Sequence, residues 1–210
     1  MGIRDKSSIY LISTTPYEGV HHLPLLNITY LNPTIDFTLY DTLLFTSKQA
    51  VKALFEQYSI EKKFTIITIG AATQKCVETY GHQVTYVASK NDANSLAKEI
   101  KKHFYHQKIL YLRPKEVAYD IAQNMENIDA VTLYQTTCNP CMFKAPPKKS
   151  ILIFTSPKLV DCFMKIYPLE GYNCIAIGET TKASFPTHIT VLTPESPSIA
   201  KAIQLASKIH

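Results

Sequence analysis

The sequence contains no tryptophan, and among its 210 residues only six are glycine and five are cysteine. No stretch provides the ~20 consecutive apolar residues that a membrane-spanning helix requires. None of the glycines forms the Gly-x-Gly-x-x-Gly fingerprint of dinucleotide-binding folds, and no phosphate loop, zinc signature or Ser/His/Asp order is present. These absences argue against a membrane protein, against a nucleotide-dependent enzyme and against the common hydrolase and metalloenzyme classes.

The cysteine pattern indicates reduced thiols. Five is an odd number, and the N-terminal residues lead directly into a short apolar run, Ile9–Ile12, which is typical of a first strand and too short for the core of a signal peptide. We therefore expect a cytoplasmic protein. Cys138 and Cys141 form a lone C-x-x-C, and a zinc site would need a second pair, so we interpret the cysteines as incidental and expect no bound metal. The adjacent His21 and His22 are interpreted as part of a surface turn.

The positive charge is modest and unevenly placed. The net charge is +5, and residues 30–131 carry 12 basic and 11 acidic side chains, whereas the rest carries 10 and 6. This excess is well below the basic clustering of a nucleic-acid binder. It suits a small anionic ligand, and a solvated basic surface explains it equally well.

An internal repeat is the most informative feature. The segment 43–51, Leu-Leu-Phe-Thr-Ser-Lys-Gln-Ala-Val, recurs as Leu-Ile-Phe-Thr-Ser-Pro-Lys-Leu-Val at 152–160. The segment 67–73, Ile-Thr-Ile-Gly-Ala-Ala-Thr, recurs as Ile-Ala-Ile-Gly-Glu-Thr-Thr at 175–181. Both pairs are separated by about 108–109 positions, so the chain contains two copies of one unit.

Each copy has the alternating strand and helix pattern of an α/β fold. Short, continuously apolar runs rich in β-branched residues indicate parallel strands that are covered on both faces. Each run ends in Ser, Thr or Gly before a helical pattern, with Ser47 and Ser156 at N-cap positions and Pro157 at the first helical position. Asn91-Asp92 and Ser196-Pro197 are expected to open two further helices, and Gly81 to end one.

The third part of the repeat is displaced. Lys-Ile-Leu-Tyr-Leu-Arg-Pro at 108–114 resembles Ser-Ile-Tyr-Leu-Ile-Ser-Thr at 8–14, which lies at the start of the chain. This predicts a continuous domain at 30–131 and a discontinuous domain made of 1–22 plus 139–210. The chain then crosses twice between the domains, at 23–29 and 132–138, and we expect the two crossing strands to pair.

The ordered set of motifs resembles the uroporphyrinogen-III synthase family. It consists of Phe-Thr-Ser at 45–47, Ile-Gly-x-x-Thr at 69–73, Val-x-x-Tyr-Gln-Thr at 131–136, Phe-Thr-Ser at 154–156 and Ile-Gly-x-Thr-Thr at 177–181. The resemblance implies two similar parallel-sheet α/β domains of flavodoxin- or Rossmann-like type, joined by a two-stranded β linker, with the substrate in the cleft between them. It also implies a monomer without a cofactor.

The reaction that the resemblance implies is the cyclisation of hydroxymethylbilane to uroporphyrinogen III in haem biosynthesis. Water is lost and the last pyrrole, ring D, is inverted. The substrate carries eight carboxylates, and the preceding enzyme of the pathway would be a transient partner that hands it over. One departure from the family is an expected Thr-Arg-Pro-like turn that reads Thr-Thr-Pro at 14–16, with too little chain after it for a full first helix.

The candidate binding residues follow from the fold class, because ligands of open parallel sheets lie beyond the carboxyl ends of the strands. There, hydroxyls and free helix amides can receive carboxylates. The same residues would also serve as ordinary helix caps in any α/β fold. They are Thr46, Ser47, Gly70, Thr73, Thr155, Ser156, Gly178, Thr180 and Thr181.

Tyr134 is the candidate catalytic residue. It matches the tyrosine of the family, and a phenol with a reference pKa of ~10 stays protonated at neutral pH, so it can help to expel the hydroxyl group. A space-filling role in a linker strand is the alternative. Two other functions stay open: a non-catalytic two-domain protein that binds an anionic small molecule, and, less favoured, a nucleotide-dependent α/β enzyme.

Overall fold

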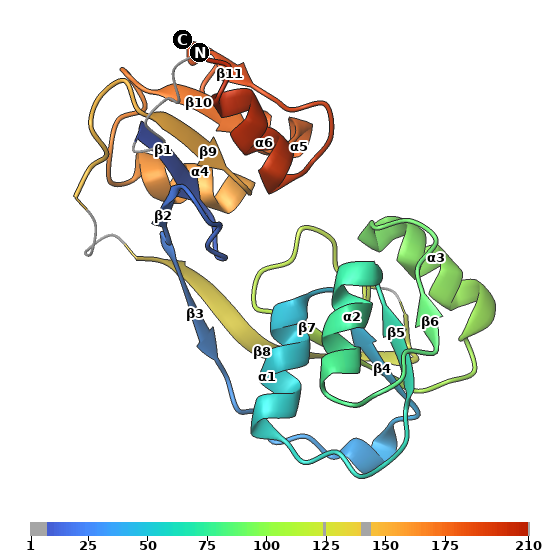
Figure 1. Ribbon diagram of the computed structural model, residues 1–210. Helices are drawn as coiled ribbons and strands as arrows, with labels where there is room; N and C mark the ends of the chain where they lie inside the picture. The colour runs from blue at the N-terminus through green and yellow to red at the C-terminus, as the bar shows by residue number, and fades with distance from the viewer. Residues whose placement is uncertain (1–7, 124, 140–143, 210) are drawn as a thin grey trace. The chain divides into compact units, whose positions relative to one another are not determined.

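The computed structural model describes residues 8–123, 125–139 and 144–209. The chain divides into two compact units, which we call the split unit (Met1–Asn27 with Thr137–His210) and the continuous unit (Ile28–Thr136). Within the described ranges, no helix is both long and apolar enough to cross a membrane. Figure 1 labels the elements of both units.

The continuous unit is built on a six-stranded sheet with the order β3-β8-β7-β4-β5-β6. The four neighbouring pairs from β8 to β6 are parallel. Its elements in chain order are β3 (Leu26–Tyr30), a 3-10 turn (Phe37–Leu39), β4 (Thr42–Phe45), α1 (Lys48–Gln57), β5 (Thr65–Thr68), α2 (Ala71–Thr79), β6 (Tyr86–Val87), α3 (Ala93–His103), β7 (Ile109–Pro114) and β8 (Ile128–Cys138).

The split unit is built on a five-stranded parallel sheet with the order β11-β10-β9-β1-β2. Its elements are β1 (Ile9–Ile12), β2 (His21–Leu23), β9 (Ile151–Phe154), α4 (Pro157–Met164), β10 (Asn173–Ala176), α5 (Glu179–Lys182), β11 (Val191–Leu192) and α6 (Ile199–Ala206). The N-terminal strand β1 pairs with β9, although about 140 residues separate them in the chain.

The two sheets share one strand order. The series β8-β7-β4-β5-β6 in the continuous unit matches β2-β1-β9-β10-β11 in the split unit, with β7 in the place of β1 and β4 in the place of β9. This is the arrangement that the displaced repeat predicts, and it confirms the expected α/β class with parallel sheets. β3 is the one additional strand, and it lies beside β8.

Helices cover both faces of each sheet. In the continuous unit, α1 and α2 pack on one face through residues such as Val51, Leu54 and Val77, and α3 packs on the other through Leu96 and Ile100. In the split unit, α4 covers one face and α6 the other. Every residue of β4 and β9 is buried, as the uninterrupted apolar runs of the sequence predict.

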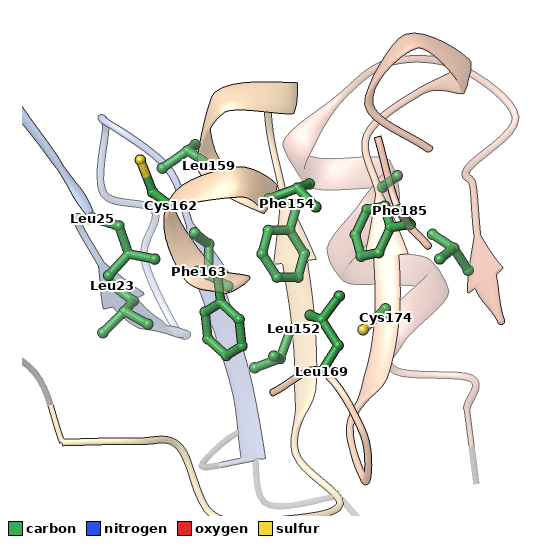
Figure 2. Packing of buried hydrophobic residues seen from close by; sticks show 14 residues of the cluster. Leu23, Leu25, Leu152, Phe154, Leu159, Cys162, Phe163, Leu169, Cys174 and Phe185 are labelled. Carbon is green, nitrogen blue, oxygen red and sulfur yellow. The ribbon is translucent and has the colours of Figure 1, made fainter. Parts of the chain in front are cut away.

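An aromatic cluster fills one core of the split unit, as Figure 2 shows. The ring of Phe154 on β9 lies 5.4 Å from that of Phe163 on α4 and 5.1 Å from that of Phe185, both in edge-to-face geometry. Such pairs stabilise a core by about 0.5–1.5 kcal/mol beyond their buried area. Leu152 and Cys174 pack into the same cluster.

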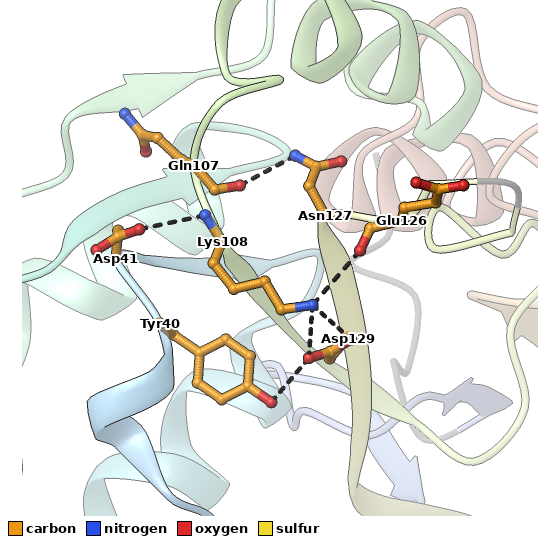
Figure 3. A network of polar contacts seen from close by, with 7 residues as sticks. All are labelled: Tyr40, Asp41, Gln107, Lys108, Glu126, Asn127 and Asp129. Atoms are coloured by element: carbon orange, nitrogen blue, oxygen red, sulfur yellow. Dashed lines mark hydrogen bonds and ion pairs between the residues drawn. The ribbon is translucent and has the colours of Figure 1, made fainter.

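Polar residues at the amino ends of β4, β7 and β8 bind one another (Figure 3). Lys108 Nζ lies 3.0 Å from Asp129, whose Oδ2 atom also accepts a hydrogen bond from the Tyr40 hydroxyl (3.1 Å). The Lys108 N–H donates to Asp41 (3.2 Å), and the Asn127 side chain donates to the Gln107 carbonyl (3.0 Å). These contacts satisfy one another, so this edge of the sheet has a structural role.

The helix boundaries follow the capping signals closely. Ser47 caps α1, Asp92 caps α3, and Gly81 follows α2 with a φ of 81°, the left-handed conformation that glycine adopts without strain. Pro157 is the first residue of α4. The last helix begins at Ile199 with Ser198 as N-cap, two residues later than the Ser-Pro pair predicted. No helix occurs between β1 and β2, as the short interval there predicts.

Two local interpretations were wrong. His21 and His22 lie in strand β2, because parallel pairing to β1 satisfies their backbone groups; the ring of His21 stacks on Tyr10, and His22 Nε2 lies 2.9 Å from the Ser13 carbonyl oxygen. Cys138 is not incidental, since it forms a disulfide with Cys162 on α4, so the expectation of reduced thiols is wrong for this pair. Cys141, the other cysteine of the C-x-x-C motif, lies outside the described residues.

The chain passes between the units twice, along β3 and β8. The Asn139 N–H donates to the Leu25 carbonyl (2.8 Å), and the Leu31 N–H donates to the Leu133 carbonyl (2.7 Å), so residue numbers on the two segments run in opposite directions. The first crossing is interrupted at Pro24 and Leu25, where Leu25 is buried in the core of the split unit. The independence of the two units as folding domains stays a prediction.

Candidate functional site

Each sheet gathers predicted binding residues at one edge. In the continuous unit, Thr46 and Ser47 follow β4, while Gly70 and Thr73 follow the neighbouring strand β5. Because parallel strands share their carboxyl edge, these residues lie on the same edge of the sheet as Tyr134, which lies in β8 opposite Pro114 at the end of β7. In the split unit the equivalent positions follow β9 and β10, and are Thr155, Ser156, Gly178, Thr180 and Thr181.

Ser47 joins a helix cap to the candidate catalytic tyrosine. Its Oγ atom accepts a hydrogen bond from the Ala50 N–H (3.1 Å), which makes it the side-chain cap of α1. The same Oγ atom lies 2.9 Å from the Tyr134 hydroxyl. A serine hydroxyl has one donor and two acceptor positions, so Ser47 can accept from both partners and still donate one hydrogen bond.

Tyr134 is held from both its backbone and its side chain. It is 7% exposed, it packs in the core cluster beneath α1, and its carbonyl accepts a hydrogen bond from the Lys115 N–H (2.8 Å). Burial raises the pKa of the Tyr134 phenol above its usual value, against the opposing effect of the Ser47 hydrogen bond. The phenol is therefore protonated at every pH near neutrality.

A second buried tyrosine, Tyr111, reaches the same edge from the other face of the sheet. Its hydroxyl lies 3.1 Å from Thr46 Oγ1, and its side chain belongs to the core cluster beneath α3. Since Thr46 and Ser47 are consecutive, each one meets a phenol from a different face. Burial is the largest influence on the pKa of Tyr111 and raises it. Tyr111 was not among the predicted site residues, although its place near the end of an apolar run was visible in the sequence.

Arg113, close to the carboxyl end of β7, was also missed. Its guanidinium lies 3.6 Å from the Asp120 carboxylate, and its side chain is 20% exposed. Its Nε atom is buried and has no hydrogen-bond partner within the described part of the chain. Arg113 follows the strand-end position that the repeat assigned to Ser13 in the split unit, so the two copies carry different chemistry there.

The turn after β5 brings backbone close to a neighbouring side chain. Gly70 is the N-cap of α2 and has an extended backbone, and a Cβ atom placed there would lie 2.7 Å from Asn91 Oδ1. The absence of a side chain therefore leaves room for Asn91. Thr73 is only 5% exposed, so its side chain serves packing more than ligand contact.

The equivalent edge of the split unit differs in its hydrogen bonds. Thr155 Oγ1 donates to the Ile12 carbonyl (3.1 Å), which ties the end of β9 to β1. Ser156 is the N-cap of α4, but no hydrogen bond from its side chain completes the cap. Thr181 is 4% exposed, whereas Thr180 beside it is exposed. Gly178 precedes α5, a helix of only four residues.

A cavity of about 440 Å³ opens at the strand-end edge of the continuous unit. Thr46, Ser47 and Tyr111 line it, together with the start of α3 and the segment 114–119. A larger cavity of about 570 Å³ lies elsewhere in this unit, beside Lys62, Phe64 and His82, and none of the predicted site residues lines it. Over the described ranges, no three or more His, Cys, Asp or Glu side chains are grouped as metal ligands would be.

The family profile that matches this chain and two solved structures with a similar fold indicate one family. The family profile of uroporphyrinogen-III synthase HemD matches residues 18–204. The fold is similar to the crystal structure of uroporphyrinogen-III synthetase from Helicobacter pylori 26695, with a TM-score of 0.79 and 23% sequence identity over 95% of this chain and 98% of that one.

A mutant uroporphyrinogen III synthase from the extremely thermophilic bacterium Thermus thermophilus is more distant, with a TM-score of 0.58 and 12% identity over 93% of this chain and 96% of that one. None of the curated proteins compared with the sequence matches it. The family profile covers most of the chain and agrees with the two parallel sheets and their strand-end motifs. The chain therefore belongs to the uroporphyrinogen-III synthase family, whose members are cyclising lyases of haem biosynthesis.

Proposed function

We propose that this chain converts hydroxymethylbilane to uroporphyrinogen III, closing the ring with inversion of ring D and loss of water. The observation that carries the proposal is the family match over residues 18–204. The duplicated strand-end edges support it, because they offer helix amides and hydroxyls of the kind that bind carboxylates. We further propose that the reaction takes place in the cytoplasm and that the preceding enzyme of the pathway hands over the bilane.

The chemistry needs little from side chains beyond geometry. The C–O bond of the terminal hydroxymethyl group breaks with help from the pyrrole electron pair, and a substituted carbon of ring D attacks to give a spiro intermediate. This intermediate fragments and recloses with ring D inverted. The substrate cyclises spontaneously without inversion, so the protein must hold one unfavoured geometry. Restricting a flexible chain in this way contributes through proximity and orientation.

The leaving hydroxyl group is proposed to receive its proton through Ser47 from Tyr134. The 2.9 Å contact between the two hydroxyls allows the transfer, and Ser47 lines the cavity whereas the buried Tyr134 does not. The hydroxyl and the proton leave together as water. The phenolate then regains a proton, because the substrate loses one when its pyrrole system is restored. The raised pKa of Tyr134 keeps the phenol protonated between turnovers.

Carboxylate binding is proposed at the remaining strand-end residues. Gly70 and the split-unit residues Thr155 and Gly178 would present backbone amides and a hydroxyl to the substrate carboxylates, whereas Thr46 lines the cavity beside Ser47. Ser156 and Thr180 are the most available side chains, since the first makes no capping hydrogen bond and the second is exposed. The buried Thr73 and Thr181 would shape the turns that carry these groups.

The direct test is isomer analysis. The purified chain is incubated with hydroxymethylbilane generated enzymatically in the same tube, and the products are oxidised and separated as uroporphyrin isomers. We expect isomer III to predominate, while a control without the chain gives only the spontaneous isomer I. Isomer I alone in both samples would contradict the proposal and favour a non-catalytic binding protein.

A further inference from the structure

The cavity beside Thr46 has an unusual lining for a protein whose proposed ligand is an octacarboxylate. Its walls come from three places: the end of β4, the start of α3, and β7 with the residues after it up to Tyr119. Its volume of about 440 Å³ is within the range of small-molecule sites. All of its lining residues belong to the continuous unit.

Apolar atoms provide most of this lining, and its polar part is rich in hydrogen-bond acceptors. The carboxylates of Asp92 and Glu116 line the cavity, with the hydroxyls of Thr46, Ser47 and Tyr111. Asp92 is ionised at neutral pH like any exposed aspartate, and hydrogen bonds from Ser95 lower its pKa further. No lysine, arginine or histidine is among the lining residues of the described chain. The nearest cations lie outside the lining: Arg113 pairs with Asp120 and opposes the rise that burial causes in the pKa of Tyr111, and Lys90 adds to the lowering of the pKa of Asp92.

An aromatic wall accompanies the acceptors. Tyr119 lines the cavity with 45% of its surface exposed, which is high for a large apolar ring. An exposed ring at the mouth of a cavity offers a face on which a flat ligand can stack. Tyr111, by contrast, is 1% exposed and contributes to the floor. The cavity therefore combines a stacking surface with acceptors for hydrogen-bond donors.

A pyrrole ring matches this combination. It is flat and aromatic, and its ring edge carries one N–H donor and no acceptor. A carboxylate does not match, since two negative side chains would repel it at short range. Resting on the proposed function, we propose that this cavity binds the N–H edge of a pyrrole unit of the substrate, with Asp92 and Glu116 as acceptors and Tyr119 as the stacking face, and that the substrate carboxylates bind outside it.

The first test measures binding without turnover. Two probes are compared by titration calorimetry with the full chain: a dipyrromethane dicarboxylate with free N–H groups, and its N,N′-dimethyl analogue. We expect the N–H probe to bind about tenfold more tightly, as the loss of a hydrogen bond to a charged group predicts. Equal binding of the two probes, or no binding of either, would overturn the inference.

Variants of the chain test whether this difference in affinity between the two probes arises in the cavity. In an Asp92→Asn/Glu116→Gln double variant, the preference for the N–H probe should fall below about threefold. Asparagine caps a helix as well as aspartate does, so α3 keeps its N-cap. Glu61→Gln removes one exposed charge from the same unit, outside the cavity lining, and should leave the preference unchanged. Tyr119→Ala should weaken the binding of both probes equally.

The sign of the change in KM provides a second, kinetic test. If pyrrole N–H groups bind here, the double variant should raise KM for hydroxymethylbilane about tenfold, because acceptor strength is lost. If carboxylates bind here, removal of two negative charges should instead lower KM, and that result would overturn the inference. Failure of the proposed function itself would look different, since the unmodified chain would then form no isomer III.

Discussion

The hydroxyl oxygen of Tyr134 lies 2.9 Å from Ser47 Oγ, and this contact joins strand β8 to the N-cap of helix α1. Ser47 also caps α1 through the Ala50 N–H. Ser47 therefore contacts the Tyr134 phenol, caps α1 and lines the cavity. Any change at Ser47 should affect helix stability and chemistry together, whereas a change at Tyr134 should affect chemistry more selectively.

The Tyr134→Phe variant separates the proposed proton-donor role of the hydroxyl from the packing role of the ring. The variant keeps the ring that fills the core beneath α1 and loses the hydroxyl. We expect a folded protein with kcat lowered about 10²–10⁴-fold, little change in KM, and continued formation of isomer III. Steady-state kinetics with isomer analysis checks this. Tyr58→Phe is the control, because its hydroxyl bonds the Pro33 carbonyl away from the cavity (2.6 Å). Unchanged turnover in Tyr134→Phe would leave positioning as the mechanism.

Ser47→Ala and Ser156→Ala form a matched pair across the repeat. Only Ser47 makes a side-chain capping hydrogen bond, so its loss should lower the free energy of unfolding by about 1 kcal/mol, and loss of Ser156 should change it much less. Ser156→Ala should instead raise KM up to about tenfold, if this hydroxyl binds a carboxylate. Urea unfolding and kinetics measure both effects. Equal losses of stability in the two variants would show that the capping hydrogen bond of Ser47 does not cause the loss.

The disulfide should stabilise the split unit. Cys138 and Cys162 are 24 positions apart, and closing a loop of that size contributes about 3 kcal/mol in the chain-entropy view. Cys162→Ala should therefore unfold at lower urea concentration than the oxidised protein. Reduction should bring the unmodified chain close to the variant. Mass analysis after alkylation gives the decisive count: five labelled thiols in the untreated protein would mean that no disulfide forms.

Buried tyrosines predict a loss of stability at high pH. Burial raises the pKa of both Tyr111 and Tyr134 above the unfolded value of ~10. Between the unfolded and folded pKa values, the folded state holds more protons, so its stability falls as pH rises through this window. Urea unfolding between about pH 8 and 11 should show the decrease, and a Tyr111→Phe/Tyr134→Phe variant should show less of it. A flat profile in both proteins would contradict the assignment.

Fragments of the continuous unit test its independence as a domain. A fragment covering 28–136 should melt cooperatively, because it contains a complete sheet with both faces covered. The shorter 30–131 predicted from the repeat lacks Leu133 and Tyr134, which are 0% and 7% exposed in the core, and should be less stable. Calorimetry of the two fragments decides this. An unfolded 28–136 fragment would mean that the units fold only together.

The repeat and its displaced third part were sufficient to predict the architecture. Continuous apolar strands must be covered on both faces, so segments such as 43–51 and 152–160 determined parallel sheets without any knowledge of contacts. The resemblance of 8–14 to 108–114 then assigned the N-terminal strand to the unit that contains 139–210, and the structure pairs this strand with β9. Ser47, Asp92 and Pro157 similarly mark helix starts, because capping depends on neighbours in the chain.

Contacts between distant segments were decided only by the tertiary structure. The sequence indicated Ser47 and Tyr134 separately, but their hydrogen bond depends on the order of strands β4, β7 and β8 in the sheet. The pairing of Cys138 with Cys162 and the role of His22 were misread for the same reason, since nothing local marks either partner.

The acceptor-lined cavity is the clearest example of this limit. Asp92 and Glu116 are ordinary charges in the sequence, and they line one cavity with Tyr111 only because α3 and the segment after β7 reach the same edge of the sheet. Periodicity and capping are properties of neighbouring residues, so the sequence by itself predicted the family and most of the strands and helices, although β2 was misread as a turn. Which donors and acceptors face each other is a property of packing, and only the folded chain decided it.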